Sequence, residues 1–334
     1  MDVLITGGAG YIGSTIASAL EDAGHTPIIL DSLVTGQRVF TESRTFFEGD
    51  IADREILGSI FSKHPNITCT IHCAALIVVP ESVEKPYLYY HENVCKSLEL
   101  FKHLEDLGHP NVVFSSSASI YDVVPDFKVT EASPLKPSSP YARTKYMMEM
   151  VLEDLTKASK LRAIALRYFN PIGADPQYRS GIHDPNPSHV IGKLVETALG
   201  KLPEFKITGT DWPTRDGSGI RDYIHIWDLA RAHVKAVERF KDVLEATSEP
   251  YNVINLGTGD GVTVKELVAA FESVWGNEIP KSEAPPRPGD VAGAYANADR
   301  ALELLSWKAE KSIDEGIESA VEWGKRREEV LGYA

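Results

Sequence analysis

The sequence opens on Val3-Leu-Ile-Thr-Gly-Gly-Ala-Gly-Tyr-Ile-Gly13, in which an apolar run meets a glycine-rich stretch. An amphipathic run to Ala23 follows at once, and this order predicts a strand, a tight turn and a helix. Gly7, Gly10 and Gly13 form the pattern G-x-x-G-x-x-G. Glycine is needed where a turn takes positive φ or where backbone approaches a ligand closely. Because the new helix directs its free N–H groups and positive dipole end at the turn, the stretch predicts a pyrophosphate site.

A second apolar run supplies the next part of this site. Pro27-Ile-Ile-Leu30 ends in Asp31, and an acid about twenty residues beyond the glycines is where a dinucleotide fold holds ribose hydroxyls. An acid at this position, rather than an arginine cluster, favours NAD over NADP. The alternative is an ordinary strand–turn–helix whose glycines are structural.

The composition is that of a globular enzyme. The chain has 334 residues, of which 43% are hydrophobic, and a formal net charge of -14. The acidic balance argues against nucleic acid as a partner, and no apolar run is long enough to span a membrane. The first strand begins at Val3, which leaves no room for a signal peptide. Three cysteines cannot form a disulfide framework and favour a reducing compartment, so we expect a cytoplasmic protein.

Strands and helices alternate through the first half of the chain. Apolar runs at 45–47, 68–73, 111–114 and 161–166 alternate with helical patterns at 53–63, 86–107 and 141–157. This succession predicts a Rossmann α/β fold, a doubly wound parallel sheet that binds ligands at the carboxyl ends of its strands. His72 and Cys73 lack further ligands nearby, so they are interpreted as packed strand residues and no metal site is predicted.

After Asn170 the pattern changes to loops, short strands and helices, which predicts a smaller, interleaved α/β substrate domain. We assign residues 1–169 to the cofactor-binding domain, with 221–258 returning to it, and 170–334, mainly 170–220 and 259–334, to the second. Residues 221–226 have the pattern of a strand. Asp228 and Thr263 are expected to cap the helices that follow them, and His225 is interpreted as strand packing.

Tyr141-Ala-Arg-Thr-Lys145 is a second chemical motif. Residues four apart share one helix face, and an ammonium beside a phenol lowers the phenol pKa from about 10 towards neutral. A nearby nicotinamide cation acts in the same direction. Tyr141 would then be a general base that removes a hydroxyl proton while hydride leaves for NAD. Ser117, at the carboxyl end of the 111–114 strand, is placed to hydrogen-bond the same substrate oxygen.

With these residues in view, the sequence resembles an extended short-chain dehydrogenase/reductase of the UDP-glucose (UDP-galactose) 4-epimerase family. The motifs run in family order from about Val3 to Trp323, and they are Thr6-Gly-Gly-Ala-Gly-Tyr-Ile-Gly13, Gly49-Asp-Ile51, Ser115-Ser-Ser-Ala118, Ser139-Pro-Tyr141 with Lys145, Leu166-Arg-Tyr-Phe-Asn-Pro171, Asp216-Gly-Ser-Gly-Ile-Arg-Asp-Tyr-Ile-His225, Asn255-Leu-Gly-Thr258 and Arg287-Pro-Gly-Asp290.

The resemblance implies epimerisation at C4 through a 4-keto sugar, with NAD retained. Tyr141 takes the O4 proton, Ser117 orients O4, and Lys145 tunes Tyr141 and touches the nicotinamide ribose. The cofactor site would also include Tyr11, Ile12, Asp31, Asp50, Ile51, Ala74, Asn93, Ser115 and Tyr168. The UDP diphosphate would be held by Asn170, Arg221 and Arg287, and the uridine ribose by Asp290.

Three positions depart from the family pattern. Ile77 replaces a lysine that contacts the cofactor ribose, so NAD is expected to be held less tightly. His189 replaces an asparagine near the diphosphate, where a partly charged imidazole could substitute for it. Ala294 stands where enzymes restricted to plain UDP-hexoses carry tyrosine, which predicts room for UDP-N-acetylglucosamine and UDP-N-acetylgalactosamine. The alternative is that Tyr295 or Trp212 fills this space.

Other functions remain open beside this one. A 4,6-dehydratase is disfavoured because Ala118 and Ser119 stand where it needs an acid pair. A UDP-glucuronate epimerase or decarboxylase of the same fold is harder to exclude, because recognition of the sugar C6 cannot be read from the sequence. An NAD-binding regulatory protein would typically lose the tyrosine–lysine pair, which this chain retains.

The resemblance also implies a homodimer that pairs through the helices at 86–107 and 141–157. Several apolar residues on these helices are candidates for the contact, although core burial would explain some of them equally well. They are Tyr90, Val94, Phe101, Met147, Met148 and Val151.

Overall fold

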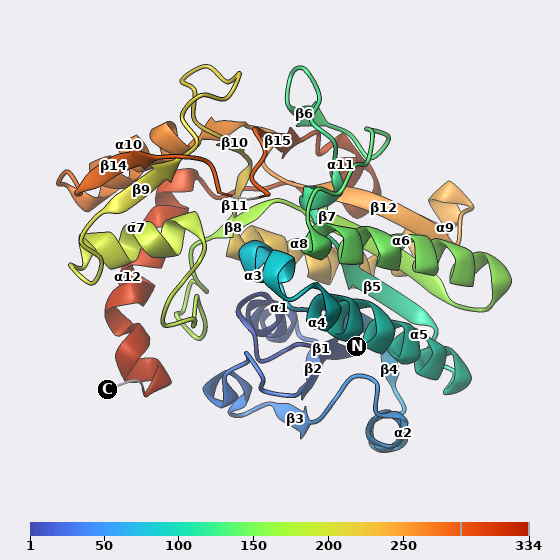
Figure 1. Cartoon of the computed structure of the whole chain (residues 1–334). Helices are drawn as coiled ribbons and strands as arrows, with labels where there is room; N and C mark the ends of the chain where they lie inside the picture. Colours follow the sequence, from blue (N-terminus) through green and yellow to red (C-terminus); the bar gives the residue numbers. More distant parts are fainter. Residues whose placement is uncertain (288, 333–334) are drawn as a thin grey trace.

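The structure, a computed structural model, describes residues 1–287 and 289–332. Its largest sheet has seven strands in the order β12-β7-β5-β4-β1-β2-β3, all parallel (Figure 1). This confirms the predicted doubly wound sheet. The strands are β1 (Asp2–Thr6), β2 (Thr26–Asp31), β3 (Thr45–Glu48), β4 (Ile67–His72), β5 (Asn111–Ser115), β7 (Arg162–Tyr168) and β12 (Tyr251–Leu256).

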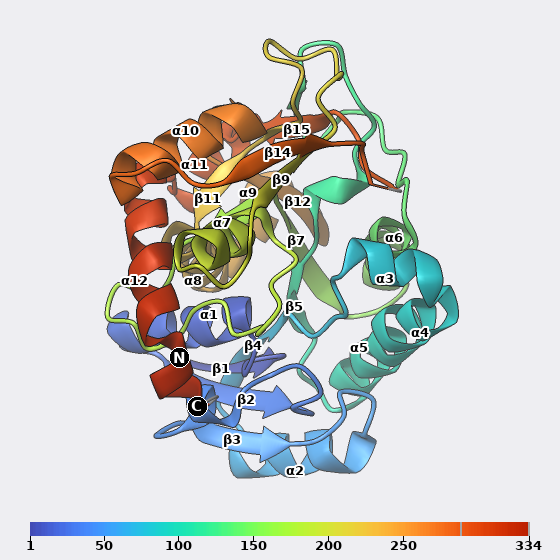
Figure 2. The same cartoon turned by 60° about the vertical axis from the view of Figure 1, so that its left-hand side comes forward.

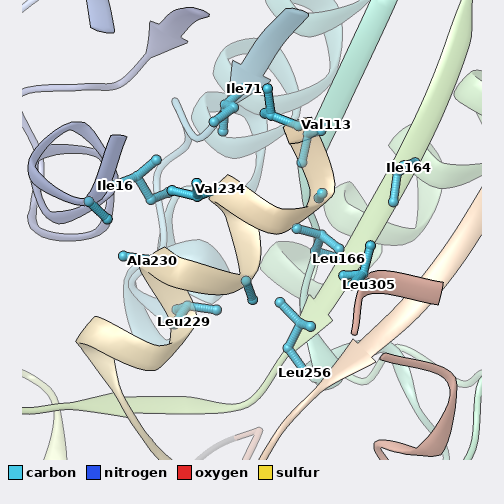
Figure 3. Close-up of a cluster of buried hydrophobic side chains, with 14 of the residues drawn as sticks. Ile16, Ile71, Val113, Ile164, Leu166, Leu229, Ala230, Val234, Leu256 and Leu305 are labelled. Atoms are coloured by element: carbon cyan, nitrogen blue, oxygen red, sulfur yellow. The ribbon is translucent and has the colours of Figure 1, made fainter. Parts of the chain in front are cut away.

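Helices cover both faces of this sheet. Val3 and Ile5 of β1 share a core with α1 (Tyr11–Asp22) and α8 (Ile226–Glu238), whereas Leu4 lies in the core of the opposite face. Figure 3 shows the first core, with Ile16 of α1 beside Val234 of α8. Burial on both faces explains why the strands have nearly continuous apolar runs. The opposite face is covered by α2 (Arg54–Lys63), α5 (Lys96–Asp106) and α6 (Pro140–Ala158).

The helical pattern at 86–107 does not form one uninterrupted α-helix. After α3 (Val79–Glu84), the chain forms α4 (Pro86–Tyr90), a π-helical turn (His91–Cys95) and then α5. A π turn is wider than an α turn and often occurs at a functional site. Here it carries Asn93, which is buried. The hydrophobic period predicted the helix but could not predict the wider turn.

The remaining elements form three smaller sheets and their helices. Strands β9, β14, β10 and β15 lie at the end of the molecule remote from β3 and α2 (Figures 1 and 2). Among the described residues, no helix has the length and apolar character to cross a membrane. The elements are β6 (Lys128–Val129), β8 (Asn170–Ile172), α7 (Val190–Ala198), β9 (Phe205–Thr208), β10 (Ile220–Arg221), β11 (Tyr223–His225), α9 (Phe240–Thr247), β13 (Val262–Thr263), α10 (Val264–Trp275), β14 (Lys281–Ala284), β15 (Gly293–Ala296), α11 (Asp299–Leu305) and α12 (Ile313–Leu331).

The stretch 221–226 is not the single strand predicted. It breaks at Asp222, whose buried carboxylate accepts backbone N–H groups of Thr258 and Ala296, so β10 and β11 enter different sheets. The expected cap of α8 is also wrong. His225 caps the helix by accepting the Trp227 N–H through Nδ1 at 3.0 Å.

Asp228 instead lies in the first turn of α8, where it is buried. Its carboxylate accepts the backbone N–H groups of Glu310 and Lys311 at 2.9 and 2.7 Å. Thr263 caps α10 as predicted, in a capping box with Glu266.

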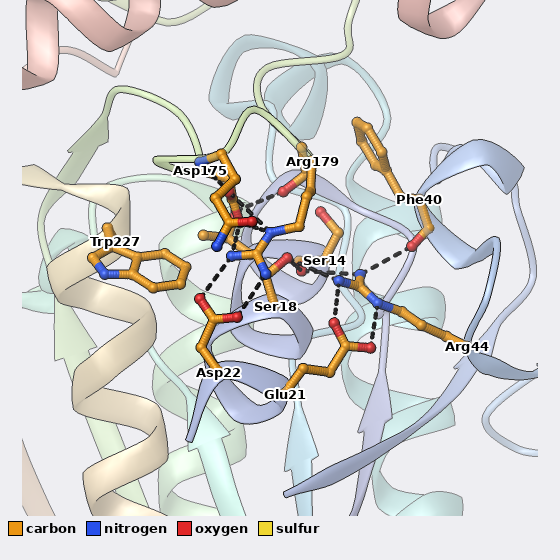
Figure 4. A network of polar contacts seen from close by, with 12 residues as sticks. Ser14, Ser18, Glu21, Asp22, Phe40, Arg44, Asp175, Arg179 and Trp227 are labelled. Atoms are coloured by element: carbon orange, nitrogen blue, oxygen red, sulfur yellow. Dashed lines mark hydrogen bonds and ion pairs between the residues drawn. The ribbon is translucent and has the colours of Figure 1, made fainter. Parts of the chain in front are cut away.

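The segment after β8 is fixed to α1. Arg179 forms an ion pair with Asp22 at 2.7 Å and also contacts Asp175, as Figure 4 shows. Nearby, the Tyr11 hydroxyl donates to the Gly173 carbonyl oxygen at 2.6 Å. The helix that begins at the glycine turn is therefore joined to the second half of the chain, which sets the two parts of the candidate site next to each other.

Candidate functional site

The glycine turn between β1 and α1 has the geometry that a dinucleotide phosphate requires. Gly7 has φ +73°, and a Cβ there would stand 2.6 Å from the Ala74 nitrogen. A Cβ at Gly13 would overlap the Gly7 carbonyl oxygen and stand 2.8 Å from the Gly8 Cα. The fold itself therefore requires glycine at both positions.

Gly10 differs from these two, because a Cβ there would meet only the Gly7 carbonyl oxygen, at an ordinary 3.5 Å. The fold itself therefore does not require glycine at this position. A ligand that approaches the turn closely would require it. Helix α1 begins directly after it, without a side-chain cap or an acid in its first turn. The N–H groups at Tyr11 and Ile12 thus belong to an open helix N-terminus, which fits a pyrophosphate.

Two acids stand at the ends of β2 and β3. Asp31 is buried and accepts the N–H groups of Ala9 at 3.0 Å and Leu33 at 2.8 Å, one on each oxygen. Each oxygen keeps a lone pair that can accept from a ribose hydroxyl. Asp50 is half-buried and bonded to Lys96 at 2.6 Å, and the adjacent Ile51 is buried. This arrangement fits NAD as the sequence predicted.

Tyr141 and Lys145 lie one turn apart on α6, whose first turn is fixed by the Ser139 cap and by proline at N1. Both side chains are buried, as is Ser117 just after β5. Lys145 Nζ donates to the Ser115 carbonyl oxygen at 2.8 Å. The structure therefore places Ser117 and Lys145 with Tyr141 near the carboxyl end of β5.

The ionisation of Tyr141 differs from the sequence-based expectation. Burial raises the pKa of Tyr141, and a hydrogen bond with Ser117 opposes this effect. Burial lowers the pKa of Lys145 to about 8, and the negative charge of Glu149 opposes this effect. The lowering of the Tyr141 pKa that the sequence predicted is thus absent from the protein alone, because desolvation is the largest effect on this phenol.

Other residues predicted for the cofactor site surround this centre. Asn93 accepts the Leu76 N–H at 2.8 Å and donates to the Leu76 carbonyl oxygen at 2.9 Å and to Thr144 Oγ1 at 3.1 Å. Its amide thus holds the loop after β4, where Ala74 lies against the glycine turn. Tyr168 is buried at the end of β7, and Ile77 is exposed on the same loop as Ala74.

The residues predicted for the sugar nucleotide lie on the smaller sheets and their loops. Arg221 and Ala294 are paired in register, so they share one face of the sheet, where Arg221 donates to the Ala292 carbonyl oxygen at 2.9 Å. Asn170 begins β8 and pairs with Tyr223.

Arg287 and Asp290 form an ion pair with each other at 3.2 Å. The motif 287–290 includes Pro288, which lies outside the described residues. The sequence predicted separate roles for the two residues but not this pair.

His189 precedes α7 and does not cap it through its side chain. Desolvation by the surrounding protein lowers its pKa, and the charge of Arg287 lowers it further. The negative charge of Asp184 opposes this effect. The protein without ligand therefore disfavours the partly charged imidazole that was expected, mainly because burial disfavours the charged form. A neutral His189 can still donate or accept one hydrogen bond.

Sequence reasoning missed a buried ion pair behind the centre. Arg167 contacts Glu149 at 2.6 Å, and the Ser116 hydroxyl donates to the same carboxylate. Helix spacing could have placed Glu149 on the same face of α6 as Lys145, four residues earlier. It could not have indicated Arg167, which lies on β7. Within the described residues, no cluster of side chains is suited to a metal ion.

Comparisons with known proteins agree with this geometry. The model of the NAD dependent epimerase/dehydratase family matches residues 3–257. UDP-glucose 4-epimerase of Bacillus subtilis is 40% identical over 100% of this chain and 99% of its own length. UDP-glucose 4-epimerase of Drosophila melanogaster is 39% identical over 99% of this chain and 98% of its own.

Solved structures give the same result. The UDP-glucose-4-epimerase of Stenotrophomonas maltophila, with bound NAD and formylated UDP-arabinopyranose, is 36% identical with a TM-score of 0.93, covering 98% of this chain and 99% of its own. The UDP-Glc/GlcNAc 4-epimerase of Campylobacter jejuni is 34% identical with a TM-score of 0.81, covering 97% and 99%. The glycine turn, the strand-end acids and these matches together show that the chain belongs to the NAD dependent epimerase/dehydratase family.

Proposed function

We propose that this chain is an NAD-dependent UDP-hexose 4-epimerase that interconverts UDP-glucose and UDP-galactose. The observation that carries the proposal is the juxtaposition of Ser117, Tyr141 and Lys145, all buried, at strand ends next to a turn suited to NAD. The full-length similarity to UDP-glucose 4-epimerases supports the same reaction.

In this reaction Tyr141 removes the proton from the sugar O4 and later returns it. NAD bound at the glycine turn would supply the hydride chemistry at the sugar C4. Ser117, already hydrogen-bonded to Tyr141, orients O4. Lys145 is anchored on the Ser115 carbonyl oxygen and supports the phenolate that forms when the proton moves.

The cofactor would also touch the residues around the glycine turn and the strand ends. We assign this role to Gly7, Gly10, Tyr11, Ile12, Gly13, Asp31, Asp50, Ile51, Ala74, Asn93, Ser115 and Tyr168. For Asn93 a direct contact would use the remaining lone pair of Oδ1, since both of its N–H donors are already used within the protein.

We assign the binding of the UDP-sugar to the second half of the chain, mainly 170–220 and 259–334. Asn170, Arg221 and Arg287 would hold the diphosphate, and the neutral His189 would donate one hydrogen bond. Asp290 would accept from the uridine ribose through Oδ1, which keeps a lone pair beside its bond with Arg287.

Ala294 supports a wider substrate range. It shares a sheet face with Arg221, whereas the next residue, Tyr295, packs toward Gly261, and Trp212 lies against Gly209. We therefore include UDP-N-acetylglucosamine and UDP-N-acetylgalactosamine as substrates. Ala294→Tyr should remove turnover of the acetylated pair and leave the plain pair within about twofold.

We further propose a homodimer in the cytoplasm. Phe101 and Met148 belong to the core and are unavailable for the contact, but Met147 is exposed on α6 and Tyr87 on α4. Such an exposed apolar face fits pairing through α4, α5 and α6. Free cysteines fit a reducing compartment. Sedimentation at micromolar concentration should give twice the chain mass, and a monomer would contradict the dimer.

The direct test is an assay of the purified protein on the plain and the acetylated UDP-hexose pairs and on UDP-glucuronate, with and without added NAD. We expect both hexose pairs to interconvert with no net reduction of NAD. Turnover of UDP-glucuronate alone would favour a UDP-glucuronate epimerase. NAD binding with no turnover of any sugar nucleotide would instead favour an NAD-binding regulatory protein.

A further inference from the structure

A buried chain of hydrogen bonds runs from the edge of the cofactor site into helix α8. Cys73 Sγ lies 3.1 Å from Ser115 Oγ, which lies 3.0 Å from His233 Nε2. The Tyr168 hydroxyl is also hydrogen-bonded to Ser115. Ser115 and His233 have no exposed surface, whereas Cys73 is partly exposed. The chain joins the ends of β4, β5 and β7 to a helix that none of the proposed chemistry uses.

The direction of every hydrogen bond in this chain follows from one backbone carbonyl. His233 Nδ1 lies 2.8 Å from the Leu229 carbonyl oxygen, which can only accept. Nδ1 must therefore carry the proton, and because burial lowers the pKa of His233 to about 4, the ring is neutral at pH 7 and Nε2 is an acceptor. The single hydroxyl proton of Ser115 then goes to His233. Cys73 and Tyr168 are left to donate to Ser115 Oγ.

We propose that His233 is a positioning residue: by accepting the Ser115 hydroxyl proton, it obliges Cys73 to remain a neutral donor beside Lys145. The charge that acts on Cys73 is that of Lys145. Burial raises the pKa of the Cys73 thiol to about 11, in agreement with a neutral thiol.

The arrangement protects the charge on Lys145. If Nε2 of His233 were removed, the Ser115 hydroxyl would turn and donate to Cys73 Sγ. Cys73 would then lose its proton to solvent more readily, since a hydrogen bond to the charged form stabilises it. The resulting thiolate would pair with Lys145 and take from Tyr141 the positive charge that supports its phenolate.

The test measures thiol alkylation by iodoacetamide, in which the Cys73 thiolate displaces iodide to form a thioether. It uses the full-length protein with NAD added, and mass spectrometry of the digest reports each cysteine separately. Exposed Cys95 is an internal standard for reagent access, and buried Cys69 reports loosening of the fold. The variants are His233→Leu, which removes the acceptor, and His233→Gln, whose amide oxygen restores an acceptor at a similar reach.

We expect the Cys73-to-Cys95 labelling ratio at pH 7.5 to rise about tenfold in His233→Leu, since a pKa lower by one unit gives about ten times more thiolate. His233→Gln should keep the wild-type ratio. An unchanged labelling ratio in His233→Leu would overturn the proposal. Failure of Cys73 to be labelled in any variant would overturn it too. Equal labelling of Cys69 and Cys73 would also overturn it, because the effect would then be general loosening.

A second readout rests on the proposed epimerase function. For His233→Leu, kcat for UDP-galactose should fall about tenfold with KM within twofold, and His233→Gln should recover most of kcat. The labelling ratio does not depend on turnover, so the proposed role of His233 and the proposed epimerase function can fail separately. If the labelling ratio rises in His233→Leu but kcat stays within twofold of wild type, the proposed effect of this hydrogen-bond chain on Lys145 is refuted.

Discussion

On the cofactor side of the site, Asp31 and Lys145 are buried and bonded to backbone atoms. On the sugar-nucleotide side, Arg287 and Asp290 lie on a loop and are held largely by each other. Backbone partners at strand ends are fixed by the sheet, whereas partners on a loop can exchange. We infer that the cofactor side is formed before any ligand arrives and that the sugar-nucleotide side rearranges around its ligand.

The largest expected effect concerns the centre between the two sides. Tyr141→Phe removes the group that exchanges a proton with the substrate, and general acid–base catalysis contributes about 10²–10⁴-fold. We expect kcat to fall by about 10³-fold while UDP affinity and NAD content remain within twofold. Turnover assays with equilibrium binding of UDP measure this. A kcat within tenfold of wild type would remove Tyr141 from the mechanism.

The rigidity of the cofactor side can be tested with a matched pair of glycine variants. Gly13→Ala places a Cβ against the Gly7 carbonyl oxygen and should lower the free energy of unfolding by about 3 kcal/mol, because packed backbone has no room to move. Gly10→Ala meets ordinary spacing and should leave stability within about 0.5 kcal/mol while weakening NAD binding. Chemical denaturation and NAD titration would separate the two. Equal stability of both variants would contradict a preformed turn.

Burial of Lys145 should cost stability in the cofactor-free protein. Its pKa in the folded state is about 8, below the ordinary lysine value of 10.5, so the unfolded chain holds the proton more tightly. The penalty is complete below pH 8 and disappears as pH rises to about 10.5. Lys145→Met should therefore raise the free energy of unfolding at pH 7, by up to about 3 kcal/mol, and lose this advantage near pH 10.5.

Thermal unfolding of both proteins across this pH range measures the effect, and both must be free of NAD. An advantage of Lys145→Met that stays constant from pH 7 to pH 10.5 would show that packing, and not the buried charge, is its cause.

The smallest expected effect lies on the sugar-nucleotide side. Arg287→Ala should raise KM for UDP-glucose about tenfold with little change in kcat, because the diphosphate is bound in the ground and transition states alike. Arg54→Ala is the matched control, an exposed arginine on α2 at the far end of the molecule. Steady-state kinetics of both variants decide the matter. A fall in kcat without a change in KM would place Arg287 in the chemistry instead.

The same contrast explains how much could be predicted from the sequence. The strand–turn–helix at 3–23, the acid at 31 and the pair Tyr141 and Lys145 follow from periodicity and spacing, because backbone geometry determines their positions. The Arg287–Asp290 pair and the π turn around Asn93 could not be predicted, since they depend on side-chain partners and on the packing of the finished fold. The raised pKa of Tyr141 belongs to the same class, because burial decides it.

In the proposed reaction, hydrogen leaves C4 as hydride and returns without meeting solvent, while Tyr141 exchanges only the O4 proton. The most direct measurement is epimerisation of UDP-glucose carrying deuterium at C4 in ordinary water, followed by mass spectrometry of the product. We predict that UDP-galactose retains the deuterium at C4. Loss of the deuterium to solvent would contradict the claim.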